Sequence, residues 1–266
     1  MFIQTPTFKD IQTNPPLGDK GRINIYLPEG EGIFPYILGI HGGGWEAGDR
    51  NSYSHFWPRI KPTGIAFVLC SYRVFREARY PAAYYDILHL FKWLERNGWN
   101  YRLDSSRYVL LGGSAGGHLS MLSGLRATKE EDDICGIKGI VDYCGIMDLV
   151  DQYAHDQVRG NTMTPDFMGG TPSEKTDAYK EASPINHIHS CAPKVWIAHG
   201  TIDNIVPVEQ SRKMVSLLRN AGHSPVFMEA EGRKHTMTTD DSLPFDKVEF
   251  LFEKEMLKFV SDCFLH

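Results

Sequence analysis

Several features that would assign the chain to a specialised class are missing from its 266 residues. No basic block alternates with aromatic residues, and with a formal net charge of −5 no nucleic-acid partner is expected. No run of about 18 apolar residues occurs, so no membrane-spanning segment is expected. Internal repeats, low-complexity tracts and interior linkers are also absent, which indicates a single domain over residues 1–266.

The five cysteines are odd in number, widely spaced and form no Cys-x-x-Cys pair, which argues against a disulfide scaffold. Cys70, Cys144 and Cys191 lie in or beside apolar runs, where we expect them to be reduced and buried. The N-terminal residues lack a basic region followed by an apolar core, so we expect no signal peptide. Together these features favour a cytoplasmic location.

No phosphate-binding pattern, neither Gly-Lys-Ser/Thr nor Gly-x-Gly-x-x-Gly, accompanies the glycines of the chain. The glycines at 42–44 instead follow an apolar run at 36–40 and stand between His41 and Trp45. Three glycines after a strand let backbone N–H groups turn toward a small cavity. A plain flexible turn is the alternative.

The strongest positive signal is residues 112–116, Gly-Gly-Ser-Ala-Gly, which fit the pattern Gly-x-Ser-x-Gly. A buried strand is expected before it at 108–111, and apolar residues at helical spacing follow at 118–125. Ser114 would then lie at a strained strand-to-helix corner with its hydroxyl pushed out over the sheet. The glycines two before and two after it are needed because a Cβ there would collide with the neighbouring strand or helix. A glycine-rich corner with an incidental serine is the alternative.

Mostly continuous apolar strands alternate with helical stretches, which predicts an α/β fold with a parallel sheet between helices. Residues 1–22 are expected to be polar turns, and residues 51–64 an irregular aromatic segment. Residues 150–190 predict an insertion of loops and short helices beside the site. The expected strands are 23–27, 36–40, 65–70, 108–111, 137–145, 195–199 and 225–230, and the expected helices are 82–97, 118–125, one ending at Ala221 and one beginning at about Phe245.

A serine becomes a nucleophile when a base takes its proton and a third group orients that base. In parallel sheets the functional loops follow the carboxyl ends of strands. Asp203 follows the strand 195–199 and His235 follows the strand 225–230, in the order Ser, Asp, His that an elbow serine uses. The sequence therefore predicts Ser114, Asp203 and His235 as a catalytic triad.

Other acids and histidines fit these roles less well. Asp142 lies within a strand, Asp148 follows a strand too early, and Glu231 is too near His235 in sequence to orient it. We expect His41 and His199 to brace loops by hydrogen bonds, and His118 leaves the elbow in poor geometry for a base. The pair His187 and His189 has no accompanying set of Cys, Asp or Glu ligands, so no metal is predicted.

These motifs together resemble α/β-hydrolases of the lipase and esterase group related to hormone-sensitive lipase and to bacterial acetyl-xylan and feruloyl esterases. The resemblance covers roughly residues 20–260 and implies an eight-stranded, mostly parallel sheet with helices on both faces. The larger relatives carry a helical cap at the N-terminus, and we expect no large N-terminal cap here. The matching residues are His41-Gly42-Gly43-Gly44-Trp45, Ser71-Tyr72-Arg73, Gly112 to Gly117, Ala182-Ser183-Pro184-Ile185, His199-Gly200-Thr201-Ile202-Asp203 with Val206-Pro207, and His235.

The resemblance implies a serine carboxylesterase that needs no cofactor and acts on a small-molecule ester. Gly43 and Gly44 would join Ala115 as donors to the oxyanion. A small mouth lined by Trp45, Tyr72 and Met147 would favour short acyl groups, acetyl first, with carbohydrate esters among the candidates. The oligomeric state is left open, a homo-oligomer included.

Two other functions fit part of the pattern. Arylformamidases share the His-Gly-Gly-x-Trp motif, so an amidase-type hydrolase with the same triad remains an alternative. A ligand-binding protein on the same scaffold is a further alternative, although such proteins usually lose a member of the triad.

Overall fold

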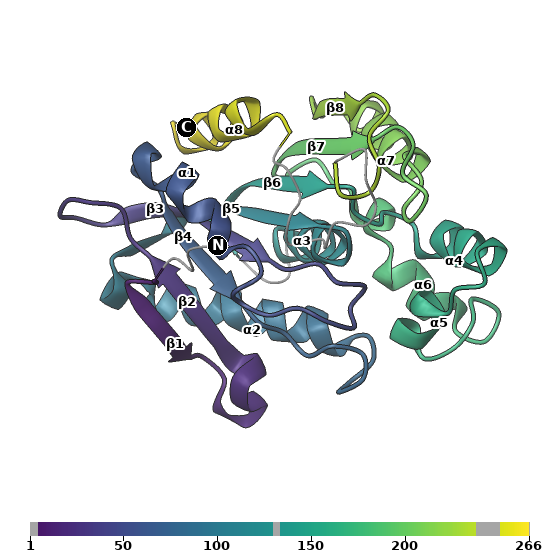
Figure 1. The fold of residues 1–266 in the computed structure, drawn as a ribbon, viewed down its shortest axis with the longest axis horizontal. Helices are drawn as coiled ribbons and strands as arrows, with labels where there is room; N and C mark the ends of the chain where they lie inside the picture. The colour runs from purple at the N-terminus through teal and green to yellow at the C-terminus, as the bar shows by residue number, and fades with distance from the viewer. Residues whose placement is uncertain (1–4, 130–133, 238–250, 266) are drawn as a thin grey trace.

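The computed structural model describes residues 5–129, 134–237 and 251–265. One eight-stranded sheet forms its centre, in the order β1-β2-β4-β3-β5-β6-β7-β8 (Figure 1). β1 and β2 and then β2 and β4 pair antiparallel, and every other neighbouring pair is parallel. The predicted eight-stranded, mostly parallel sheet is therefore confirmed.

The elements have the following bounds. The strands are β1 (Phe8–Gln12), β2 (Arg22–Tyr26), β3 (Phe34–Ile40), β4 (Ala66–Cys70), β5 (Leu103–Gly113), β6 (Ile137–Tyr143), β7 (Lys194–Gly200) and β8 (Val226–Ala230). The α-helices are α1 (Trp57–Ile60), α2 (Ala82–Asn97), α3 (Ala115–Ala127), α4 (Leu149–Val158), α5 (Met163–Met168), α6 (Thr176–Ala182), α7 (Glu209–Asn220) and α8 (Glu253–Phe264). Short 3₁₀ turns are η1 (Pro15–Gly21), η2 (Ser54–Phe56), η3 (Lys61–Thr63), η4 (Gly98–Tyr101) and η5 (Pro184–His187).

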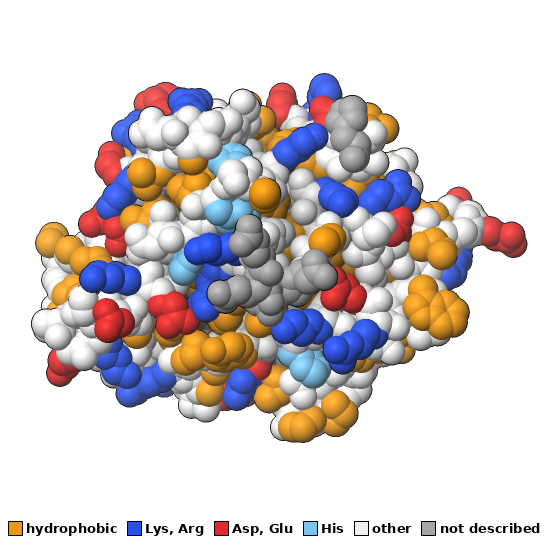
Figure 2. All heavy atoms as spheres, turned by 180° about the vertical axis from the view of Figure 1, so that it is seen from behind, with side chains coloured by type: hydrophobic (Ala, Val, Ile, Leu, Met, Phe, Trp, Pro, Cys, Tyr) orange, Lys and Arg blue, Asp and Glu red, His pale blue; other side chains and the backbone are white. Residues whose placement is uncertain are grey.

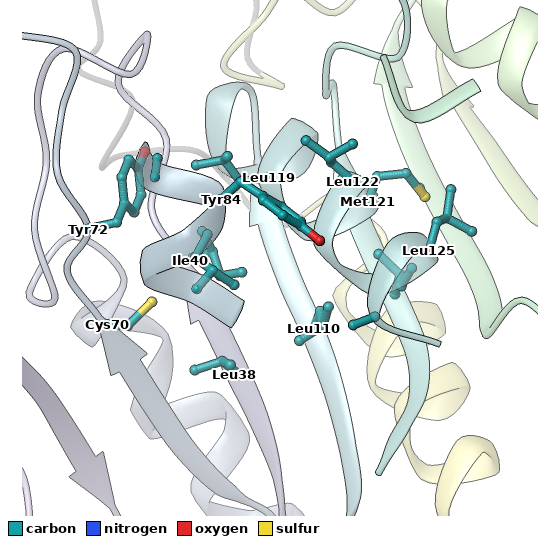
Figure 3. Packing of buried hydrophobic residues seen from close by; sticks show 14 of the residues in the cluster. Leu38, Ile40, Cys70, Tyr72, Tyr84, Leu110, Leu119, Met121, Leu122 and Leu125 are labelled. Atoms are coloured by element: carbon teal, nitrogen blue, oxygen red, sulfur yellow. The ribbon is translucent and has the colours of Figure 1, made fainter. Parts of the chain in front are cut away.

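Hydrophobic packing covers both faces of the sheet because successive side chains of a strand point to opposite sides. Leu38 and Leu110 pack toward α2 and α3, as Figure 3 shows. Their neighbours Ile37 and Val109 belong to a second cluster, which includes Trp57 of α1 and Met256 and Val260 of α8. Burial on both faces explains why the central strands read as unbroken apolar runs.

Several predicted boundaries differ from the structure. Residues 8–12 lie in the segment expected to be turns, yet they form β1, which pairs with β2 across the edge of the sheet. The segment 51–64 contains η2, α1 and η3. The predicted short helices of 150–190 are α4, α5 and α6, which gather beyond one end of the sheet (Figure 1). The final helix, α8, begins at Glu253, and the predicted start at about Phe245 lies outside the described residues.

The cysteines and the surface charges bear on the remaining sequence predictions. Cys70 and Cys144 are buried, but Cys191 is exposed, because it lies in the turn before β7 rather than in the strand. Acidic and basic side chains are interspersed over the face drawn in Figure 2. No helix among the described residues is both long and apolar enough to cross a bilayer.

Candidate active site

Ser114 occupies the sharp corner between β5 and α3. Its backbone is held at φ 54° and ψ −124°, a region that side-chain-bearing residues rarely adopt. A Cβ on Gly112 would lie 2.2 Å from the carbonyl oxygen of Gly116, and one on Gly116 would lie 2.1 Å from the carbonyl oxygen of Ile40. Both contacts are with backbone, so only glycine allows α3 to approach β5 and β3 this closely.

The three residues predicted as a triad lie in one hydrogen-bonded chain. The Nε2 atom of His235 is 2.9 Å from Ser114 Oγ, and its Nδ1 atom is 2.6 Å from Asp203 Oδ2. The carboxylate can only accept, so Nδ1 carries the proton and the lone pair of Nε2 faces the serine hydroxyl. All three residues are buried, with exposed fractions of 4% for Ser114, 8% for Asp203 and 4% for His235. Their hydrogen bonds are therefore shielded from bulk water.

Asp203 is held as a carboxylate by converging donors. Burial alone would raise its pKa, but the attraction of His235 and the hydrogen bonds from His199 and His235 outweigh burial and bring the pKa well below its usual value. The second carboxylate oxygen, Oδ1, accepts the N–H groups of Ile205 and Val206 at 2.8 and 2.9 Å. An ionised carboxylate beside Nδ1 stabilises the imidazolium that forms when His235 takes a proton.

The glycine loop lies next to the elbow because Gly116 packs against the carbonyl groups that end β3. Gly43 and Gly44 have φ values of 103° and 62°, which turn their peptide groups out of the strand direction. Among the described residues, no backbone carbonyl accepts the N–H of either glycine. Ala115 is the first residue of α3, so its N–H has no acceptor one turn earlier. These three N–H groups are the predicted oxyanion donors, and they remain available.

The three residues predicted to line the mouth are fully buried, so they do not form an open rim. Trp45, Tyr72 and Met147 are each 0% exposed. The Tyr72 hydroxyl donates to the carbonyl of His41 at 2.8 Å, and its ring stacks on the His41 ring. Their aromatic and apolar surfaces pack in the interior beneath the loops. The sequence pattern does not reveal this burial.

A buried link joins the glycine loop to α3 and to the insertion. Trp45 Nε1 donates to His118 Nδ1 at 3.1 Å, so the opposite nitrogen of His118 carries the proton and donates to the carbonyl of Ala182 at 2.8 Å. Burial lowers the pKa of His118 to about 4, which keeps the ring neutral. Trp45 also stacks on Phe167 of α5, with ring centroids 4.3 Å apart. His118 is thus a structural link.

Met163, at the start of α5, is a neighbour of the glycine loop that the sequence did not single out. A Cβ on Gly44 would lie 2.4 Å from the Met163 sulfur, so this side chain covers one side of an expected oxyanion donor. Met163 belongs to no recognisable motif. Only its position in the insertion could have suggested a role.

The remaining candidates have local roles. Asp142 accepts the N–H of Gly145 at 3.1 Å, and Asp148 caps the start of α4 by accepting the N–H of Val150 at 2.9 Å. His187 and His189 contact different backbone carbonyls, those of Glu181 and Leu125. Glu231 is exposed in the loop after β8.

One group of described side chains has ligand atoms close enough for a metal ion, namely Cys144, Asp203 and His235, all within 4.8 Å of one another. Asp203 and His235 already share a proton in a 2.6 Å hydrogen bond. Burial raises the pKa of the Cys144 thiol well above its usual value, which disfavours the thiolate that a metal would need. We therefore interpret the three as parts of the hydrogen-bonded site.

The chain is similar to known proteins over most of its length. The family model described as BD-FAE matches residues 23–218. A relative named probable carboxylic ester hydrolase LipM, from Mycobacterium tuberculosis, is 28% identical over 204 residues, which cover 73% of this chain and 47% of the relative. The chain spans about half the length of the curated relatives it matches.

Solved structures share the fold over nearly the whole chain. A truncated carbohydrate esterase from gut microbiota superposes with a TM-score of 0.81 at 23% identity and covers 98% of this chain and 99% of its own. An acetyl ester-xyloside bifunctional hydrolase from Caldicellulosiruptor lactoaceticus gives a TM-score of 0.76 at 20% identity, covering 97% of each chain. The expected α/β-hydrolase fold is confirmed.

Proposed function

Because the chain belongs to the BD-FAE family, we propose that it is a serine carboxylesterase that hydrolyses short-chain acyl esters, acetyl esters first. The observation that carries the proposal is the geometry of His235, whose two ring nitrogens lie 2.9 Å from Ser114 Oγ and 2.6 Å from Asp203 Oδ2. That arrangement supplies a nucleophile, a general base and the group that orients the base.

In the proposed reaction His235 takes the proton of Ser114 while Oγ attacks the ester carbonyl carbon. The oxyanion accepts hydrogen bonds from the N–H of Ala115 and from that of Gly43 or Gly44. His235 then gives its proton to the departing alkoxide, which leaves as the alcohol. Water enters, and its oxygen attacks the acyl carbonyl carbon while His235 takes a proton from it. The bond to Ser114 Oγ then breaks as His235 gives this proton to Oγ, which releases the acid and restores Ser114 and neutral His235.

Two observations support a short acyl group and a carbohydrate ester. The Met163 side chain lies against Gly44, which restricts the space beside the expected oxyanion donors. The solved structures similar to this chain include a carbohydrate esterase and an acetyl ester-xyloside bifunctional hydrolase. Acetylated sugars are therefore the first natural substrates to test.

A panel of p-nitrophenyl esters, from acetate to long acyl chains, tests the proposal with Ser114→Ala as the decisive variant. We expect kcat/KM to be highest for acetate, and the loss of Ser114 to lower turnover by at least about 1000-fold because the nucleophile is removed. Ser216→Ala, which changes an exposed serine of α7, is the matched control and should hydrolyse normally.

Two outcomes would contradict this function. Unchanged turnover in Ser114→Ala would remove the mechanism, and activity confined to long chains would remove the short-acyl assignment. Acetylated xylo-oligosaccharide and an N-formyl aromatic amine are assayed beside the panel. Faster turnover of the formamide would favour the arylformamidase alternative.

A further inference from the structure

A second histidine reaches the carboxylate that orients His235. His199 lies in β7, and its Nε2 atom is 3.1 Å from Asp203 Oδ2, the same oxygen that His235 Nδ1 contacts. His199 is 0% exposed, so this contact is made without competing solvent. The sequence predicted only that His199 would brace a loop.

The partners of His199 determine which ring nitrogen carries the proton. Nε2 faces two acceptors, the Asp203 carboxylate and the carbonyl of Val206 at 2.9 Å, so it must be the protonated nitrogen. Nδ1 is then the acceptor, and the hydroxyl of Ser211 in α7 donates to it at 2.7 Å. Ser211 is also fully buried, so the hydroxyl has a fixed partner.

We propose that His199 is a positioning residue that donates an N–H to Asp203 and so tunes how strongly Asp203 holds the proton on His235. The proposal rests on the proposed function. Asp203 Oδ2 shares its negative charge between two N–H donors, His235 at 2.6 Å and His199 at 3.1 Å. A carboxylate with two donors holds the proton on His235 less strongly than one with a single donor.

Other ionisable groups face this cluster and enter the test. Asp142 of β6 lies near His199, and burial raises its pKa to about 7. Burial keeps the Cys144 thiol protonated. Glu229 of β8 is also near His199, but its hydrogen bond from Arg212 lowers its pKa, so it stays ionised through neutral pH. Asp142 is the only one of these three whose charge changes near neutrality.

The experiment compares pH profiles of kcat/KM for p-nitrophenyl acetate. In His199→Leu we expect the acid limb to move to higher pH by on the order of one unit, which is the effect of losing one charge-assisted hydrogen bond. His199→Gln places an amide N–H near the position of Nε2, so it should return the limb toward the wild-type position. If His199 only filled space, the acid limbs of His199→Leu and His199→Gln would lie at the same pH.

Ser211→Ala and Ser216→Ala form a matched pair on α7. Ser211→Ala removes the hydroxyl that fixes the tautomer of His199, so a smaller shift in the same direction is expected. Ser216 is exposed and its loss should leave the profile unchanged. The profiles are repeated with Asp142→Asn, in which the shift caused by His199→Leu should persist.

Three results would overturn the proposal. These are an acid limb that does not move in folded His199→Leu, a Gln variant displaced as far as Leu, or a shift that vanishes in the Asp142→Asn background. If His199→Leu does not fold, an unmoved limb in Ser211→Ala also overturns it. Nitrogen NMR of labelled histidine follows the titration of His235 without turnover, so a failure of the esterase assignment remains distinguishable.

Discussion

Asp142 is a carboxyl group that the fold places under the elbow with little to stabilise its charge. Its side chain is 0% exposed, and Oδ2 accepts the N–H of Gly145 at 3.1 Å. Among the described residues Oδ1 has no hydrogen-bond partner. A Cβ on Gly117 would lie 1.9 Å from Oδ1, so the turn of α3 closes over it. This burial raises the pKa of Asp142 from 3.8 to about 7.

We predict that Asp142→Asn stabilises the protein above neutral pH. A carboxyl group whose pKa is raised on folding keeps its proton in the native state after the unfolded chain has released it. The free energy of unfolding of the wild type therefore falls as pH rises from 3.8 to about 7 and then levels off. The variant avoids this loss, by at most about 4 kcal/mol. Urea denaturation at pH 5 and pH 8 measures the gain, which should be larger at pH 8.

Asp177→Asn, at an exposed position of α6, is the control for a change of charge without burial. A gain of the same size at both pH values for Asp142→Asn would show that the carboxyl group is not titrating between them.

At the scale of elements, the insertion is packed onto the glycine loop and α3 of the candidate site. The start of α5 places Met163 against Gly44, Phe167 stacks on Trp45, and Ala182 at the end of α6 accepts from His118. The position of α5 therefore affects the glycine loop directly.

We predict that Gly44→Ala lowers kcat about 10- to 100-fold with a smaller effect on KM, because its strained φ of 62° and the Met163 sulfur together displace an oxyanion donor. Combining it with Met163→Ala should recover part of the loss, since the crowding is removed but the strain remains. Steady-state kinetics on p-nitrophenyl acetate measures this cycle.

Gly64→Ala is the matched control, because Gly64 also has a positive φ, of 73°, but no atom near an added Cβ. If the double variant is no faster than Gly44→Ala, contact with Met163 does not limit the loop.

Elements with a clear hydrophobic periodicity could be predicted from the sequence. Elements whose structure depends on contacts with residues distant in sequence could not. Helix 82–97 was predicted with its observed bounds, because one apolar stripe and Asn97-Gly98 define it. β1 was missed, because Phe8–Gln12 is only partly buried and gains its structure from pairing with β2. Ser114, Asp203 and His235 could be chosen from motif order, whereas the contact of His199 with Asp203 depends on how the 200–206 turn folds back.

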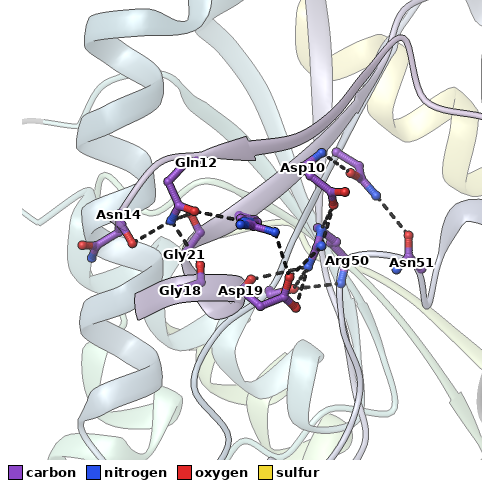
Figure 4. A network of polar contacts seen from close by, with 11 residues as sticks. Asp10, Gln12, Asn14, Gly18, Asp19, Gly21, Arg50 and Asn51 are labelled. Atoms are coloured by element: carbon purple, nitrogen blue, oxygen red, sulfur yellow. Dashed lines mark hydrogen bonds and ion pairs between the residues drawn. The ribbon is translucent and has the colours of Figure 1, made fainter. Parts of the chain in front are cut away.

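At the scale of the whole molecule, Arg50 connects the N-terminal segment to the loop that follows the glycine cluster (Figure 4). The Arg50 side chain is 8% exposed, and its guanidinium contacts Asp10 of β1 at 2.5 Å and Asp19 of η1 at 2.9 Å. The Arg50 backbone N–H and the guanidinium also donate to Ser71 Oγ, at 3.1 and 3.3 Å. One buried cation thus joins three segments that are distant in sequence.

We predict that Arg50→Met lowers the free energy of unfolding by about 2–4 kcal/mol, because two aspartates lose their common partner and a buried hydrogen-bond network is broken. Chemical denaturation measures the change. Arg76→Met is the matched control, since Arg76 pairs with Glu46 of the same loop at 69% and 43% side-chain exposure, and should cost less than about 1 kcal/mol. Equal losses in the two variants would contradict a special role for the Arg50 network.

The three residues of the site are supported unequally by the sheet. Ser114 follows β5, which is paired with β3 and β6, whereas His235 follows β8, which pairs only with β7 among the described strands. If β8 separated from β7, Ser114 would keep its position at the elbow, whereas His235 would lose its position beside Ser114. Under the proposed function, ester turnover would therefore depend on the pairing of β8 with β7, whereas the conformation of the elbow would depend only on the central strands.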